Sequence, residues 1–227
     1  MSLIYFVRHG ESVSNVNYIF NNSLEEDPLT EKGILQAKAT AKWLADKPID
    51  ALYSSPIPRA LETAKLIAEE IKKPIQVLPQ LMEFRIGDLQ NKTMNDENFF
   101  LHDTILNEWK NGLREVSFPG GENHLQLIQR FNEAMRRMVG EHPSGTIAAV
   151  GHGGQIIFGL KAICPNASWE PVWGRIMSNC AITHAEISLF NHRLVGRLDY
   201  WANADHLPRE LVNSKILSGR ILSKWHH

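Results

Sequence analysis

Residues 3–12 read Leu3-Ile4-Tyr5-Phe6-Val7-Arg8-His9-Gly10-Glu11-Ser12, and this stretch decides the fold of the chain. Its first half is a run of β-branched, aromatic and aliphatic residues that ends abruptly in charge and glycine. This pattern is typical of a buried strand that leads into a loop. In open α/β sheets, ligands bind outside the carboxyl ends of the strands. The polar residues after Val7 are therefore candidates for a functional site.

Segments that favour strands and helices alternate along the rest of the sequence. Apolar residues recur at helical spacing after Thr30, and Pro48 follows the end of this run. Short apolar runs bounded by turn residues favour strands. Such alternation is typical of a parallel sheet with helices on both faces. The further predicted strands cover 49–53, 74–78 and 146–150, and the predicted helices cover 31–46, the stretch from Pro56 to Ile71, and 155–163.

Two regions break this alternation. Residues 91–117 are polar and rich in Asn and Asp, with aromatic insertions, which favours a partly helical excursion outside the sheet. Residues 182–190 and 194–201 flank Asn191-His192-Arg193, which predicts an antiparallel hairpin at the sheet edge. The tail after His206 is predicted to be peripheral.

These segments together predict an α/β fold with one domain over residues 1–227. We expect three layers, α/β/α, with a mostly parallel central sheet and an antiparallel edge hairpin. The excursion would form a short helical cap insertion at about residues 88–119. No internal repeat or Pro/Gly-rich linker divides the sequence.

The composition is that of an ordinary folded protein without a strong charge bias. Of the 227 residues, 43% are hydrophobic and 22% are charged, with a formal net charge of -1, which predicts no general attraction to nucleic acid or membranes. Cys164 and Cys180 form no close-spaced metal or redox motif, as expected in a reducing cytosol. The N-terminus lacks the features of a secretory signal, and no segment has the roughly 20 apolar residues of a membrane helix. We therefore expect a cytoplasmic protein, and we leave His226 and His227 out of metal arguments.

Ionisable side chains gather at the ends of four predicted strands. Arginine binds phosphate bidentately and keeps its proton, whereas a neutral imidazole can attack phosphorus and a charged one can donate a hydrogen bond. Together with a carboxyl group, these residue types suit phosphoryl transfer through a phosphohistidine. The residues are Arg8 and His9 after the first strand, Arg59 after the second, Glu83 after the third and His152 after the fourth.

Other mechanisms fit the sequence less well. No serine lies in a Gly-x-Ser-x-Gly elbow, and Ile156 stands where a dinucleotide fingerprint beginning at Gly151 needs its third glycine. There is no Gly-Lys-Ser/Thr phosphate loop, no His-Glu-x-x-His motif and no paired Cys/His spacing of a metal site. We therefore expect a reaction that uses neither a metal ion nor an organic cofactor.

Several sequence blocks follow one another in an informative order from about Ile4 to His206. The blocks are Arg8-His9-Gly10-Glu11-Ser12 with Asn15, Asp27-Pro28-Leu29-Thr30-Glu31-Lys32-Gly33 with Gln36-Ala37, Ser54-Ser55-Pro56 with Arg59-Ala60 and Thr63-Ala64, Leu81 with Glu83 and Gly87, Gly120-Gly121-Glu122, and Gly151-His152-Gly153-Gly154. In this order they resemble the histidine phosphatase superfamily, in its phosphoglycerate-mutase-like branch. One block alone would be a weak signal, and the ordered set is a strong one.

The resemblance implies a role for each matching residue. It implies that His9 is the nucleophile and that Glu83 is the proton donor. The phosphate pocket would consist of Arg8, Arg59 and His152, with Asn15 assisting and with Ser12 and Gly153 as further substrate contacts.

Alternatives remain open for several of these positions. Glu11 is the main rival to Glu83 as the acid, because it lies close to His9 in the sequence. Ser12 and Glu122 either line the pocket or cap helices. The histidines without a partner pattern are predicted to be exposed, and these are His102, His124 and His142.

The implied chemistry places requirements on two pKa values. Attack by His9 requires a neutral imidazole, and like-charge repulsion from Arg8 and Arg59 would hold its pKa down. Glu83 must be protonated to donate to the leaving alkoxide and then ionised to activate water. A bound phosphate would raise its pKa and the arginines would lower it. We expect a neutral to mildly acidic pH optimum.

The cap decides between mutase and phosphatase chemistry, because it controls access of water to the phosphohistidine. Here it is short and lacks the Arg- and Pro-rich insert associated with cofactor-dependent phosphoglycerate mutases. The family's Gly-x-Trp-Glu-Gly block reads Gly87-Asp88-Leu89-Gln90-Asn91. We favour a phosphatase acting on a small phosphomonoester, with candidate alcohol contacts at Phe99, Phe100, Trp109 and Lys110.

Two alternative functions stay open. One is a cofactor-dependent phosphoglycerate mutase, and the other is a non-catalytic phosphate-binding module. Exposed residues in the late hairpin would permit a homodimer.

Overall fold

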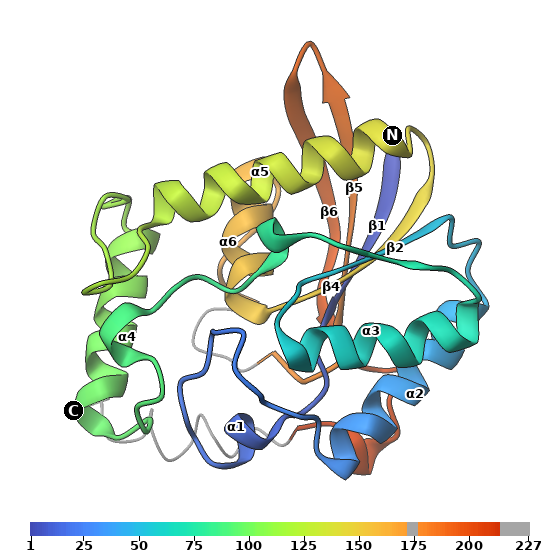
Figure 1. Ribbon diagram of the computed structural model, residues 1–227. Helices are drawn as coiled ribbons and strands as arrows, with labels where there is room; N and C mark the ends of the chain where they lie inside the picture. Colours follow the sequence, from blue (N-terminus) through green and yellow to red (C-terminus); the bar gives the residue numbers. More distant parts are fainter. Residues whose placement is uncertain (172–176, 214–227) are drawn as a thin grey trace.

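A computed structural model describes residues 1–171 and 177–213, which form an α/β fold around one six-stranded sheet (Figure 1). The strand order is β3-β2-β4-β1-β5-β6. The first four strands in this order are parallel, and β5 and β6 are antiparallel. The predicted fold class, including the edge hairpin, is confirmed. The strands are β1 (Ser2–Arg8), β2 (Ala51–Ser54), β3 (Ile75–Val77), β4 (Thr146–Gly151), β5 (Ile182–Phe190) and β6 (Arg193–Asn203).

Helices cover both faces of the sheet. Buried side chains of α2 and α3 pack on one face, and those of α5 and α6 pack on the other. The short α1 follows β1, and α4 belongs to the cap (Figure 1). The helices are α1 (Val13–Val16), α2 (Glu31–Ala45), α3 (Pro58–Ile71), α4 (Asp96–Lys110), α5 (His124–Glu141) and α6 (Gly153–Ile163), with short 3-10 turns η1 (Pro79–Leu81), η2 (Gly87–Leu89) and η3 (Arg209–Leu211).

Helix α5 was not among the predicted elements, although its sequence carries the signals of a helix. Leu127, Phe131 and Met138 are buried on one face, at spacings of four and seven residues. The side chain of Asn123 accepts a hydrogen bond from the backbone N–H of Gln126, which caps the first turn. This helix packs against α6 and covers the face of the sheet opposite α2 and α3.

The register between β1 and β4 brings distant residues to one level of the sheet. The strands pair in parallel, and Arg8 lies opposite Gly151. The backbone N–H of His9 donates to the carbonyl of Gly151 at 3.0 Å, which extends the pairing one residue beyond β1. His9 and His152 therefore leave neighbouring strands at the same edge.

The cap has a small aromatic core of its own. Trp109 is 1% exposed and packs edge-on against Phe84, Phe118 and Phe158. Its indole N–H donates to the carbonyl of Val116. The prediction that Trp109 contacts the substrate alcohol is therefore not supported, because this ring holds the cap to the body of the protein.

The predicted exposure of three histidines is wrong. The ring of His124 is buried and stacks on Trp109, and His102 lies partly buried among aromatic rings of the cap. His142 is half-buried, with its Nε2 3.1 Å from the hydroxyl of Tyr53. A neutral imidazole ring can pack on aromatic rings as a flat, weakly polar group. The spacing of residues in the sequence does not reveal such a contact, so the exposure of these histidines could not be predicted from it.

The prediction of a peripheral tail is also wrong for residues 207–213, the part of the tail that the structure describes. The Asn213 side chain accepts from the backbone N–H of Asn179 at 2.9 Å and donates to Glu11 at 3.0 Å, which ties the tail to the loop after β1. His226 and His227 lie outside the described residues. Within those residues, no helix is long and apolar enough to cross a membrane.

We predict that His124→Phe stabilises the protein at neutral pH by about 1 kcal/mol. Both ring nitrogens of His124 are buried without a hydrogen-bond partner in the described structure, and a phenyl ring removes this desolvation cost. Burial lowers the pKa of His124 from 6.5 to about 4. The unfolded chain therefore binds a proton that the folded chain does not, so wild-type stability falls as pH drops from 6.5 toward 4.

Urea unfolding from pH 7 to pH 5 measures both effects. The gain in stability of His124→Phe is expected to grow toward pH 5, by up to about 1.4 kcal/mol per pH unit. His192→Gln, in the exposed hairpin turn, is the control and is expected to leave the profile unchanged. Identical acid sensitivity of His124→Phe and wild type would contradict the argument.

Candidate active site

The sequence-predicted site residues come together at the carboxyl ends of the parallel strands. His9 follows β1, His152 follows β4, and Arg59 lies in the first turn of α3. Glu83 follows η1 on the chain leaving β3. All four are buried, with exposed fractions of 3% for His9, 1% for His152, 4% for Arg59 and 8% for Glu83. Their ionisation is therefore controlled by neighbouring charges and by lost hydration.

Hydrogen bonds fix the tautomer of His9. Nε of Arg59 donates to Nε2 of His9 at 2.9 Å, and a guanidinium has no acceptor, so Nε2 carries a lone pair. The proton then lies on Nδ1, which donates to the carbonyl of Gly10 at 2.8 Å. Burial holds the pKa of His9 well below its usual value, and repulsion from Arg59 and Arg8 acts in the same direction. His9 is therefore a neutral imidazole with a basic nitrogen that faces a cation.

His152 is neutral for the same physical reason. Nη2 of Arg59 lies 3.4 Å from its Nδ1, and its Nε2 lies 2.8 Å from the hydroxyl of Ser55, which fits a proton on Nε2. Burial first, and then Arg59 and Arg130, lower its pKa far below the usual range. The rings of His9 and His152 have centroids 5.3 Å apart, with Arg59 bonded to both.

Asp27 balances the charge of Arg59. Its carboxylate lies 3.1 Å from Nη1 of Arg59, and both side chains are almost completely buried. Asp27 also accepts hydrogen bonds from the hydroxyls of Ser12 at 2.9 Å and Ser14 at 2.7 Å. The sequence analysis quoted Asp27 within a family block and gave it no role. Its position in the sequence carried no signal for this role, because spacing does not show which loop folds over Arg59.

The remaining contacts of Arg59 come from the loop after α1. Nη1 donates to the carbonyl of Asn21 at 2.6 Å, and Nη2 donates to the side chain of Asn22 at 3.3 Å. These residues were also missed, because nothing in a polar loop shows which carbonyl faces an arginine. The guanidinium is held by several acceptors, so its position beside His9 is fixed.

The predicted substrate contacts occupy different places. The hydroxyl of Ser12 is fully buried on Asp27, so it positions Asp27 and Arg59. The side-chain oxygen of Asn15 accepts from Asn179 at 3.1 Å, and Asn179 also donates to the carbonyl of His9 at 3.0 Å. The side chain of Asn179 therefore links Asn15 to the backbone of His9.

Arg8 supplies the second guanidinium of the site and is partly buried. Its Nη1 donates to the carbonyl of Met177, and burial together with repulsion from Arg59 lowers its pKa to about 10. Gly153 lies against it, since a Cβ placed on Gly153 would be 3.7 Å from Cδ of Arg8. Arg8 therefore keeps its charge at neutral pH. Its side chain lies next to the first turn of α6.

Glu83 binds the N-terminus of α6. Its carboxylate accepts from the backbone N–H groups of Gly154 at 2.9 Å and Gln155 at 2.6 Å. Burial raises the pKa of Glu83, and these hydrogen bonds and Arg59 oppose the rise. The net shift is upward, which favours a carboxyl group that can hold and release a proton.

An ion pair between the buried Glu122 and the partly exposed Arg130 holds the chain on both sides of Glu83. Glu122 forms a two-pronged contact with Arg130, at 2.8 and 3.1 Å, and accepts from the backbone N–H of Arg85. Arg130 donates in turn to the carbonyl of Met82 at 2.6 Å. Glu122 does not cap a helix. It fixes the backbone segment that carries Glu83.

Glu11, the rival acid, has other partners. Its carboxylate accepts from the hydroxyl of Thr30 at 2.9 Å and from Asn213 at 3.0 Å, and Lys32 lies 3.6 Å away. These neighbours belong to the start of α2 and to the tail. Glu83 lies closer to the chemistry, because it contacts α6 beside His152.

The assembled site can bind a dianion and transfer a group from it. Arg8 and Arg59 supply two positive charges, and Asp27 balances one of them. The neutral imidazole of His9 supplies a nucleophilic nitrogen and Glu83 a proton. Within residues 1–171 and 177–213, no group of three or more His, Cys, Asp and Glu side chains could hold a metal ion.

The sequence matches a known family over most of its length. Residues 4–197 match the profile of the histidine phosphatase superfamily (branch 1). The chain is 36% identical over 139 residues to the 2,3-bisphosphoglycerate-dependent phosphoglycerate mutase of Thermoplasma acidophilum, a match that spans 61% of this chain and 64% of that enzyme. It is 28% identical over 208 residues to the metal-independent phosphoserine phosphatase of Arabidopsis thaliana, across 90% of this chain and 82% of that enzyme.

Solved structures share the fold. Bacillus stearothermophilus YhfR superposes with a TM-score of 0.74 at 26% identity, covering 91% of this chain and 99% of that one. The phosphoserine phosphatase of Entamoeba histolytica, in complex with 3-phosphoglyceric acid, superposes with a TM-score of 0.71 at 23% identity, covering 92% and 100%.

A matched pair of glycine substitutions tests the packing around Glu83. A Cβ on Gly154 would lie 2.3 Å from the ring of Phe84 and 3.1 Å from the Glu83 carboxylate, whereas a Cβ on Gly153 makes only ordinary contacts. Phe84 is 3% exposed and stacked on Phe118, so it cannot move away freely. Gly154→Ala is expected to lower the free energy of unfolding by about 2 kcal/mol.

Gly153→Ala is the control and is expected to change stability by less than about 0.5 kcal/mol. Urea unfolding at neutral pH measures both variants. Equal stability of the two variants would show that the contact between Gly154 and Phe84 does not constrain the Glu83 segment.

Proposed function

Because the chain belongs to the histidine phosphatase superfamily, we propose that it is a phosphatase that hydrolyses a small phosphomonoester through a phosphohistidine at His9. The observation that carries this proposal is the neutral Nε2 of His9, held 2.9 Å from the Arg59 guanidinium. A nucleophilic nitrogen beside a fixed cation is the arrangement that attack on a phosphate dianion requires.

In the first step, Nε2 of His9 attacks phosphorus while the bond from phosphorus to the ester oxygen breaks. The phosphate replaces His9 as the partner of Arg59, and Arg8 and His152 complete the contacts to the phosphoryl oxygens. Positive charge there stabilises the negative charge that spreads over these oxygens in the transition state. Glu83 donates its proton to the leaving alkoxide, which departs as the alcohol.

In the second step, the ionised Glu83 takes a proton from water, and the hydroxide oxygen attacks phosphorus. The bond from phosphorus to Nε2 breaks, which returns neutral His9 and inorganic phosphate. Glu83 ends this step protonated and ready for the next substrate. The backbone N–H groups at the start of α6 stabilise the ionised carboxylate between the two steps.

The relatives support phosphatase chemistry on small metabolites. The Arabidopsis thaliana relative is a metal-independent phosphoserine phosphatase that aligns with 90% of this chain. The Thermoplasma acidophilum relative keeps a mutase open as the second candidate, since it is 36% identical over the region that it shares. The cap here contributes one helix, α4, which favours access of water to the intermediate.

We predict that His9→Ala abolishes phosphate release from a panel of small phosphomonoesters, with a loss of at least about 1000-fold in kcat. Inorganic phosphate should still bind, because Arg8 and Arg59 remain. Glu11→Gln is the control, because the Glu11 carboxylate contacts Thr30 and Asn213, and it is expected to keep most of the activity. Rapid acid-free quenching of wild type should trap a base-stable phosphoryl group that His9→Ala lacks.

The same assay separates the three functions. Isomerisation of 3-phosphoglycerate in the presence of a bisphosphoglycerate primer, without phosphate release, would identify a mutase. Phosphate binding without turnover of any ester would identify a binding module. Wild-type turnover by His9→Ala would remove His9 as the nucleophile.

Glu83→Gln tests the proton donor through the leaving group. A nitrophenolate leaves without protonation, whereas an alkoxide needs an acid, so Glu83→Gln should lower kcat/KM, which reports the steps up to release of the alcohol, about 100-fold or more for alkyl phosphates and much less for nitrophenyl phosphate. Wild-type kcat/KM for alkyl phosphates should fall as pH rises through the raised pKa of Glu83, because the acid form of the free enzyme disappears. This fall should be absent in Glu83→Gln, and an equal loss for both substrates would rule out the donor role.

A further inference from the structure

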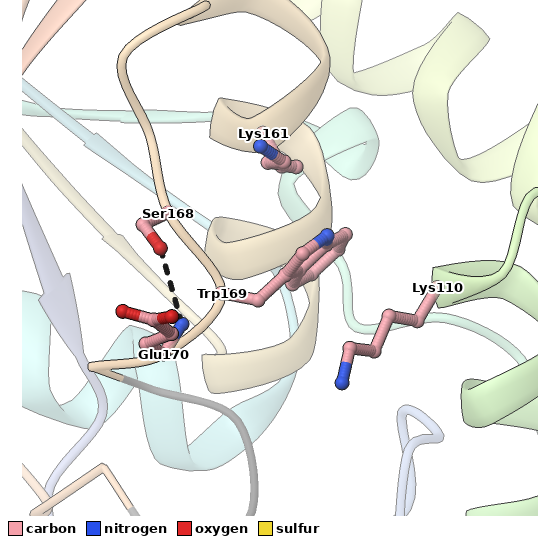
Figure 2. A pocket seen from close by; sticks show the side chains of 5 residues that line it. All are labelled: Lys110, Lys161, Ser168, Trp169 and Glu170. Carbon is pink, nitrogen blue, oxygen red and sulfur yellow. Dashed lines mark hydrogen bonds between the residues drawn. The ribbon is translucent and has the colours of Figure 1, made fainter.

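A second polar region lies toward the end of α6 that is remote from His152. A cavity of about 530 Å³ opens between α4 of the cap and the far end of α6 (Figure 2). Its walls are Lys110, Lys161, Ser168, Trp169 and Glu170. The mechanism uses none of these side chains.

One face of α6 runs from the candidate active site toward this cavity. Gly153, Ile157 and Lys161 follow one another at intervals of four residues, so they lie on one side of the helix, and all three are partly exposed. The stripe begins at Gly153, beside Arg8, and ends at Lys161 in the wall of the cavity. At 1.5 Å per residue, its length is about 12 Å.

The cavity end of the stripe carries two lysines, Lys161 and Lys110, and one carboxylate, that of Glu170, and Asp103 of α4 interacts electrostatically with Lys110. Lys161 donates to the carbonyl of Ala167 and lies 5.7 Å from the centre of the Trp169 ring. In Figure 2 Lys110 extends from α4 toward α6, whereas the carboxylate of Glu170 points away from Lys110 and from the Trp169 ring. The ring of Trp169 supplies a flat apolar surface between the two ammonium groups.

We propose that this cavity binds the far end of the substrate's alcohol, and that this end carries a carboxylate. The proposal rests on the proposed function, since it places the phosphate at Arg8 and His9. The complementary ligand has a phosphate at one end, an apolar or flat middle that lies along Ile157 and Trp169, and a carboxylate about 10 Å away that Lys161 and Lys110 bind.

Three synthetic phosphomonoesters test this match of length and charge. Phosphooxyhexanoate carries phosphate and carboxylate at opposite ends of its chain. Hexyl phosphate has the same length without the carboxylate, and phosphoglycolate has both groups on a short chain. We expect kcat/KM for phosphooxyhexanoate to exceed both others by about tenfold, the effect of one partly exposed charge-assisted hydrogen bond.

Lysine variants identify the group responsible. Lys161→Met and Lys110→Met should each raise KM for phosphooxyhexanoate several-fold, while hexyl phosphate is unaffected. Lys161→Arg keeps the charge and should keep most of the preference. Lys38→Met, on the exposed face of α2, is the matched control and should change nothing.

Equal kcat/KM for phosphooxyhexanoate and hexyl phosphate, or equal effects of the lysine variants on both esters, would overturn the proposal. Binding of both esters to His9→Ala by calorimetry separates it from the proposed function. If the wild type releases no phosphate from any ester, the proposed hydrolysis fails. A tenfold tighter binding of phosphooxyhexanoate that Lys161→Met removes would still support the carboxylate site, and equal binding would reject it.

Discussion

The site depends on one buried charge, the guanidinium of Arg59. A buried cation is costly unless it is paired and hydrogen-bonded, and Asp27, at 3.1 Å, supplies the negative charge. The same guanidinium donates to Nε2 of His9, so the group that needs neutralisation also fixes His9 as a neutral imidazole. Removal of Asp27 alone would leave an unpaired buried cation, which is the costly way to break such a pair. The remaining contacts of the site are arranged around this constraint.

The fold satisfies the constraint by bringing separate segments to one edge of the sheet. Arg59 lies at the start of α3, Asp27 in the loop before α2, and His152 at the start of α6. Parallel pairing of β1 with β4 places Arg8 opposite Gly151, so the two histidine-bearing loops begin at the same level. The loops must also be polar and closely packed, because each buried donor needs an acceptor within reach.

The positions of the strand ends could be predicted from the sequence. The contacts that the side chains make there could not. Alternation of strand and helix segments predicted the sheet, because parallel strands must be covered by helices on both faces. The role of Asp27 and the burial of Ser12 could not be predicted, since spacing does not show which loop folds over which. Helix α5 could have been found from its apolar spacing, whereas the stacking of His124 on Trp109 depends on tertiary contacts alone.

In the proposed mechanism Glu83 holds a proton in one step and loses it in the next, and its surroundings shift its pKa in opposite directions. Burial raises its pKa, while the N–H groups of Gly154 and Gln155 and the charge of Arg59 lower it. A phosphate dianion bound at Arg59 screens that positive charge and repels the carboxylate, so arrival of the substrate raises the pKa of Glu83 further. Departure of the alcohol leaves water as the next proton source, and the N–H groups of α6 then stabilise the ionised form. In the proposed mechanism, the charge of the bound phosphate therefore couples the protonation state of Glu83 to the progress of the reaction.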